Sequence, residues 1–167
     1  MSLSMHSALV PPATRTLQNL ATILGKAQAH CQEKGLDAQA FLQARLFPDM
    51  FPLVRQVQIA CDMVKGGAAR LAGQTIPSFP DDEASFAELQ ARIERTIAFL
   101  NSFEAPQIDG SEGRDIVIPL KDREVRLKGQ AYLTEWVLPN FYFHVTTTYG
   151  LLRHNGVALG KRDFLGG

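Results

Sequence analysis

Apolar residues recur at intervals of three and four along four separate stretches of this chain. This spacing follows one face of an α-helix, which has 3.6 residues per turn, and it limits the fold more than any other feature. The positions in the first three stretches are Leu17, Leu20, Leu24, Ala27 and Cys31; Leu53, Val57, Ala60, Val64, Ala68 and Leu71; and Phe86, Leu89, Ile93, Ile97 and Leu100. Together with a fourth stretch over 132–155, they predict an all-α four-helix bundle.

Several residues mark the expected helix ends. Gly35, Gly73 and Gly156 follow the first, second and fourth stretches, where glycine commonly ends a helix. Ser85 with Glu88 three residues later predicts a capping box at the start of the third helix. The acidic residues 81–83 lie just before it, and we expect them to interact favourably with the positive end of its dipole.

Prolines and one further cap complete this outline. Pro52 suits the first turn of the second helix, predicted over 51–71. Pro11 and Pro12 either lie near the start of the first helix or kink it, and Pro139 is expected to bend the fourth. Asp37 can cap a short helical segment over 37–45.

Residues 104–130 depart from the helical spacing. Ile116, Ile118 and Leu120 alternate with other residues, and so do Val125 and Leu127. Because side chains of a strand alternate between two faces, we predict a small β-hairpin that turns at 121–123 and packs on the bundle.

The fourth helix is apolar nearly all round, which is typical of a central helix or of one that also faces a partner chain. Its apolar residues are Leu133, Trp136, Val137, Leu138, Phe141, Tyr142, Phe143, Val145, Tyr149, Leu151 and Leu152. Within this surface Asn140, His144 and Thr148 are spaced by four and share one face. Buried polar groups need partners, so this line either forms internal hydrogen bonds or meets a ligand.

The second helix carries a polar stripe beside its apolar one. Arg55, Gln58, Asp62 and Lys65 are spaced by three, four and three, and Gln56 lies on the opposite flank. The stripe is either a solvated face with an ion pair between Asp62 and Lys65, or it turns Gln58 or Asp62 toward His144 to complete a polar pocket between helices.

Composition narrows the function classes. The 167 residues suit a single domain over 1–167, and a net charge of zero argues against nucleic acid or an anionic membrane as a partner. We find no apolar run near the length of a membrane span and no secretory signal over 1–10, so we expect a cytoplasmic protein with Cys31 and Cys61 reduced. Common nucleotide-binding, hydrolase and H-E-x-x-H motifs are absent.

Five segments resemble a bacterial family of unknown function within the DinB/YfiT-like group of metal-dependent proteins. They read RLFPDMFPLVRQVQIACD at 45–62, DEASFAEL at 82–89, LPNFYFH at 138–144, LRHNG at 152–156 and GKRDFL at 160–165. The similarity covers nearly the whole chain. It implies an up-down-down-up four-helix bundle, often a homodimer, and the hairpin predicted above would lie between the third and fourth helices.

That topology requires a crossover from the second helix to the third. The linker from Gln74 to Ala84 has eleven residues. At ~3.3–3.6 Å per residue it can just span a helix of about 21 residues, roughly 32 Å long. The implied topology is therefore physically possible, with little slack.

The resemblance also implies a metal site, often of nickel or zinc, on three histidines, and in some members a low-molecular-weight thiol cofactor. One histidine comes from the second helix, and two lie four apart on the fourth. Here these two positions carry His144 and Thr148, while the second helix has no histidine and offers Gln58 or, less well, Asp62. Threonine and glutamine are poor ligands for such ions, so we expect a lost or weakened metal site.

Two functions follow as hypotheses. The first is a bundle with a degenerate, metal-poor pocket that binds a small molecule or associates with itself as a homodimer; its candidate residues are His144, Asn140, Thr148, Gln58, Asp62 and Arg55. The alternative is a metal- or thiol-dependent transferase or isomerase in which His144 binds nickel or zinc.

Overall fold

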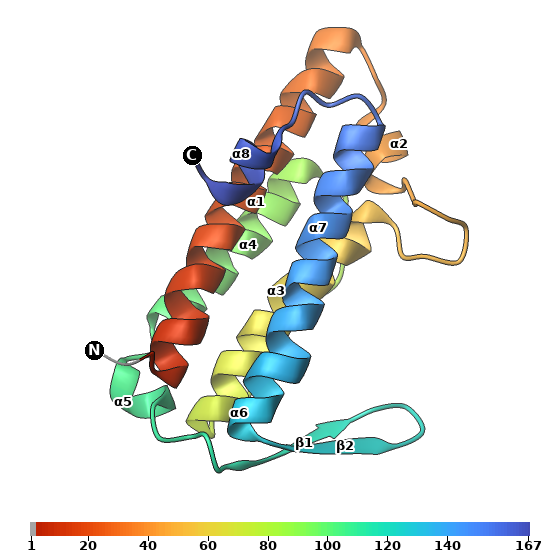
Figure 1. The fold of residues 1–167 in the computed structure, drawn as a ribbon. Coiled ribbons are helices and arrows are strands. Elements are labelled where there is room, and N and C mark those ends of the chain that lie inside the picture. Colours follow the sequence, from red (N-terminus) through yellow and green to blue (C-terminus); the bar gives the residue numbers. More distant parts are fainter. Residues whose placement is uncertain (1–2) are drawn as a thin grey trace.

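The computed structural model describes residues 3–167, and four long helices dominate it (Figure 1). The helices are α1 (Met5–Lys34), α2 (Ala38–Leu42), α3 (Leu53–Ala72), α4 (Phe86–Asn101), α5 (Ala105–Ile108), α6 (Gly129–Ala131), the π-helical η1 (Tyr132–Val137), α7 (Leu138–His154) and α8 (Lys161–Leu165). The two strands are β1 (Asp115–Pro119) and β2 (Glu124–Lys128). No helix in this described part has the length and apolar character that a membrane crossing requires.

Helices α1 and α4 lie side by side in opposite directions (Figure 1). Thr14 donates a hydrogen bond to Asn101 at 3.4 Å, whereas Gln90, earlier on α4, donates to the backbone oxygen of Ala21, later on α1, at 3.2 Å. As the contacts move forward along α1 they move backward along α4, so the two helices are antiparallel.

Helices α3 and α7 form the most extensive contact in the bundle, and they too are antiparallel. Gln56 near the start of α3 meets His144 in the middle of α7, while Gly67 near the end of α3 meets Val137, just before α7. A Cβ at Gly67 would lie 2.8 Å from Val137 Cγ1, so glycine lets the two helices approach here.

Helices α3 and α4 run in the same direction. Gln58 pairs with Glu83, just before α4, and Asp62, one turn later on α3, pairs with Arg92, which lies nine residues after Glu83. The chain therefore crosses the length of the bundle between α3 and α4, and the four long helices follow the predicted up-down-down-up order, which confirms the fold class.

Most predicted helix ends are confirmed. Gly35 and Gly73 end α1 and α3 in the left-handed conformation, with φ of 62° and 68°. Ser85 caps α4 by accepting from the N–H of Glu88 at 3.2 Å. The Glu88 carboxylate accepts from Ala84 rather than from Ser85, so the reciprocal bond of the capping box is shifted by one residue.

The start of α1 was not predicted. Ser4 and Ser7 form a capping box that begins the helix at Met5. Pro11 and Pro12 consequently lie in the helix interior rather than near its start.

The predicted fourth helix is continuous from α6 through η1 to α7. The π-helical turn of η1 comes directly before α7, whose second residue is Pro139. Proline donates no backbone hydrogen bond, and a π turn is a common way for a helix to absorb such a break.

The predicted hairpin is also confirmed. Ile116 pairs with Leu127, and Ile118 pairs with Val125. Ile116 and Ile118 are buried in the same core as the helices, so the hairpin packs on one end of the bundle (Figure 1). The short helix α8 lies against α1 and was not predicted.

Candidate functional site

His144 lies inside the bundle between α7 and α3. Its exposed fraction is 8%, and its Nδ1 lies 2.7 Å from Oε1 of Gln56. Gln56 is itself buried, and its Nε2 donates to the backbone oxygen of Phe51 at 3.0 Å. The imidazole is thus held by the first turn of α3 and, through Gln56, by Phe51, two residues before that helix begins.

This chain of hydrogen bonds assigns the tautomer of His144. The Phe51 carbonyl can only accept, so the Gln56 amide must turn its NH₂ toward Phe51 and its oxygen toward the ring. A carbonyl oxygen beside Nδ1 requires that Nδ1 carry the proton. In the neutral ring Nε2 then holds a lone pair, and no group of residues 3–167 donates a hydrogen bond to it.

The surroundings keep this ring neutral. Burial lowers the pKa of His144 below its usual value, and the positive charge of Arg55 lowers it further. The ring of Phe143 stands at a right angle to the imidazole, with 5.2 Å between the centroids. A neutral imidazole with a free Nε2 can accept a hydrogen bond, take up a proton or bind a metal ion.

Asn140 and Thr148, predicted on the same face, do not bond to the imidazole. Asn140 donates to the backbone oxygen of Trp136 at 2.7 Å, and Thr148 donates to that of His144 at 2.9 Å. Both bonds reach back one turn within the helix, so these side chains find their hydrogen-bond partners in the backbone of their own helix.

Of the two alternatives for the polar stripe of α3, the one in which Gln58 or Asp62 turns toward His144 is wrong. Gln58 donates to Glu83 at 2.9 Å and accepts from Arg55 at 3.1 Å. Asp62 accepts from Lys65 at 2.8 Å, as predicted, and from Arg92 at 3.0 Å. The polar stripe of α3 therefore faces α4 and the crossover, and the opposite flank, at Gln56, faces His144.

Arg92 is the central residue of the polar contacts between α3, α4 and the crossover, and its role was not predicted from the sequence. Its exposed fraction is 0%, and it pairs with Asp62, Asp81 and Glu83, each at 3.0 Å. It also donates to the backbone oxygen of Pro80 at 2.8 Å. Arg92 lies three residues after the buried Leu89, so a charge on the apolar face of α4 was the available signal.

The predicted role of residues 81–83 needs correction as a result. Asp81 pairs with Arg55 and Arg92, and Glu83 pairs with Arg92. Their main partners are therefore side chains of α3 and α4 rather than the dipole of α4, because the crossover runs over both helices.

The residues present do not fit a three-histidine metal site. Within residues 3–167, no three or more His, Cys, Asp or Glu side chains gather where they could hold a metal ion. The side chain that hydrogen-bonds to the His144 ring is the Gln56 amide, which is a poor ligand for nickel or zinc.

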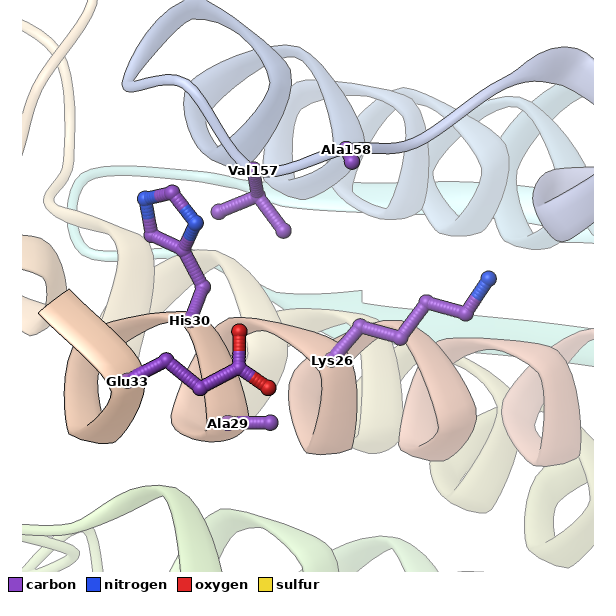
Figure 2. A pocket seen from close by; sticks show the side chains of 6 residues that line it. All are labelled: Lys26, Ala29, His30, Glu33, Val157 and Ala158. Atoms are coloured by element: carbon purple, nitrogen blue, oxygen red, sulfur yellow. The ribbon is translucent and has the colours of Figure 1, made fainter.

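None of the five pockets described for residues 3–167 is lined by His144. One of about 250 Å³ lies between α1 and the segment after α7, where Lys26, His30 and Glu33 face Val157 and Ala158 (Figure 2). Lys26 already pairs with Asp163 of α8. Of the candidate residues, only Asp62 lines one of the five pockets.

Comparison with known proteins agrees with this architecture. The model of a family described as a domain of unknown function (DUF1993) matches residues 5–165. A solved structure of a DinB family member from Shewanella denitrificans is 41% identical, with a TM-score of 0.88, and the match covers 97% of this chain and 92% of that one. The curated proteins give no significant match. The chain therefore belongs to the DUF1993 family and shares the fold of the DinB family.

Proposed function

We propose that this protein binds a small molecule at His144, with Nε2 of the neutral imidazole accepting a hydrogen bond from an N–H or O–H group of the ligand. The observation that carries the proposal is the free lone pair on a ring whose other nitrogen is fixed by Gln56. This nitrogen is not among the fully buried side-chain atoms without a hydrogen-bond partner, so an N–H or O–H group from outside the protein can reach it.

The surface beside the imidazole supports an apolar body for that ligand. Phe143, which contacts the ring, has an exposed fraction of 56%, and Phe51, whose carbonyl orients Gln56, has one of 54%. Large exposed aromatic side chains beside a polar group are typical of binding surfaces.

A thermal-shift screen of small aromatic alcohols and amines tests this function. A true ligand raises the Tm of the wild type and loses that effect in His144→Gln. At a ligand concentration of 100 times Kd the expected stabilisation is about 2.7 kcal/mol. His154→Gln, at the exposed end of the same helix, is the matched control and should respond like the wild type. Compounds that stabilise His144→Gln equally would contradict the proposal.

A second candidate function is self-association as a homodimer through the same aromatic surface. Phe47 is exposed as well as Phe51 and Phe143, and the zero net charge gives no long-range repulsion between copies. Sedimentation velocity should find a dimer that Phe143→Ser dissociates. Leu165→Ser, an equally exposed residue on α8, should leave it intact. A monomeric wild type at high concentration would exclude this function.

Metal- or thiol-dependent transfer or isomerisation is the remaining alternative, and the free Nε2 is the atom that would bind nickel or zinc. Dialysis against each ion followed by elemental analysis tests it. One ion per chain in the wild type and in His154→Gln, but none in His144→Gln, would support this alternative. Equal metal content in all three proteins would count against it.

A further inference from the structure

Ion pairs and cation–π contacts attach the crossover between α3 and α4 to both helices. Asp81 and Glu83 of the crossover pair with Arg92, and Phe79 inserts its ring among three cations. The ring centroid lies 4.1 Å from Lys65 Nζ, 4.9 Å from the guanidinium carbon of Arg95 and 5.9 Å from that of Arg92. Cations over an aromatic face are attracted to it, so this end of the crossover has a fixed position.

A pocket of about 340 Å³ lies between this crossover and α3. The charged residues in its lining are Asp62, Lys65 and Arg70, and the apolar ones include Met63, Ile76 and Phe79. Its volume falls within the range of sites for small ligands, roughly 300–1,000 Å³. It is separate from His144, since Lys65 lies nine residues beyond Gln56, about 14 Å along the axis of α3.

Positive charge exceeds negative charge in this pocket. Lys65 has an exposed fraction of 4%, and its ammonium pairs with Asp62 at 2.8 Å. The same Asp62 oxygen also accepts from Arg92 at 3.0 Å, although Arg92 has Asp81 and Glu83 as further partners. Among the described residues of the lining Asp62 is the one acidic residue, against the two cations Lys65 and Arg70, and this net positive charge attracts an anion.

Arg70 adds a second cation to the same wall. Its Nη1 donates to the neutral hydroxyl of Tyr132 at 3.1 Å, and no acidic side chain of residues 3–167 pairs with it. Gly66 makes room for it, because a Cβ at that position would lie 2.8 Å from Arg70 Nη1 and 3.7 Å from Ile76 Cδ1. The missing side chain thus lets the guanidinium lie over α3 beside the crossover.

We infer that this pocket binds a small organic carboxylate. The carboxylate pairs with Lys65 and Arg70, and the apolar body of the ligand packs against Met63, Ile76 and Phe79. Charge-assisted hydrogen bonds to a guanidinium and an ammonium supply the recognition, and the apolar wall selects an organic acid over inorganic anions.

Titration with benzoate, followed by the backbone amide NMR signals of the full chain, tests this inference. Benzoate should shift the Gly66 and Ser78 signals in a saturable way. Arg70→Gln should weaken its binding by about tenfold or more, the loss of one charge-assisted pair. Gly66→Ala, which keeps both cations but displaces Arg70, should weaken it as well. Arg153→Gln, on the exposed end of α7, should bind benzoate like the wild type.

Two further probes separate the possible ligand chemistries. Benzyl alcohol has the same ring without the charge, and inorganic phosphate has charge without an apolar body; both should bind at least about tenfold more weakly than benzoate. Equal binding of either probe would overturn the assignment. So would the absence of a saturable shift at Gly66 and Ser78, or unchanged benzoate affinity in both Arg70→Gln and Gly66→Ala.

Discussion

Nδ1 of His144 donates to Oε1 of Gln56 across 2.7 Å, and this contact joins the middle of α7 to the start of α3. Both residues are buried, with exposed fractions of 8% and 1%. Because the Phe51 carbonyl fixes the orientation of the Gln56 amide, Nδ1 of His144 must be the donor of this hydrogen bond and the Gln56 oxygen its acceptor.

Replacing Gln56 by leucine should therefore destabilise the fold. The Nδ1–H of His144 and the Phe51 carbonyl would both lose their partner, and an unpaired buried polar group costs about 1–3 kcal/mol. Urea unfolding measures the loss. Gln18→Ala, at an exposed position of α1, should change the free energy of unfolding by less than about 0.5 kcal/mol. A Gln56→Leu protein as stable as the wild type would mean that the bond contributes little.

Acidification should destabilise the wild type through His144. In the unfolded chain a histidine has a pKa of about 6.5, whereas burial and Arg55 lower the pKa of His144 in the folded protein. As pH falls below about 6.5, the unfolded state takes up a proton that the folded state does not, so stability decreases until the folded pKa is reached. His144→Gln removes this proton uptake. Between pH 7.5 and 5.5 the free energy of unfolding of the wild type should therefore fall by more than that of His144→Gln. A pH-independent difference would show that His144 titrates normally.

Local sequence signals accounted for much of the fold. Gly35 and Gly73 end their helices as predicted because a left-handed residue closes the last turn whatever lies around it. The hairpin was predictable for a similar reason, since alternation reports directly on which face of a strand is buried.

The partner of His144 could not be chosen from the sequence. Gln56 and Gln58 lie on opposite flanks of the apolar stripe of α3, about 200° apart around the helix. Which flank meets α7 depends on the rotation of α3 in the bundle, and periodicity does not determine it.

The partners of Arg92 could not be predicted for a different reason. Asp81 and Glu83 belong to a proline-containing segment whose path is set by long-range contacts.

Arg92 should be the most sensitive charged position in the described chain. Arg92→Leu would leave the buried Glu83 carboxylate without its 3.0 Å partner and would weaken the hold on the crossover. Removing one partner of a buried ion pair costs about 3–5 kcal/mol. Arg95→Gln is the matched control: this half-exposed arginine lies 3.6 Å from the same carboxylate, and its loss should cost no more than about 1 kcal/mol. Similar losses in the two variants would argue against a special role for Arg92.

Cys61 should be unreactive in the folded protein. Burial raises the pKa of its thiol to about 12, so almost no thiolate forms at neutral pH. Burial, with a smaller contribution from Asp37, also raises the pKa of Cys31. Titration with a thiol-specific chromogenic reagent should detect Cys61 only after unfolding, and Cys61→Ala should remove that late reaction. Rapid labelling of Cys61 in native buffer would contradict its burial.

The proposal for His144 requires that its Nε2 be unprotonated and free. Long-range ¹H–¹⁵N correlation NMR of the histidine rings at pH 7 measures this directly, with His144→Gln to assign the signals. The account predicts a protonated nitrogen at Nδ1 and a lone-pair nitrogen at Nε2, and a change at Nε2 when a ligand from the screen is added. A ring protonated at both nitrogens, or one with its single proton at Nε2, would contradict it.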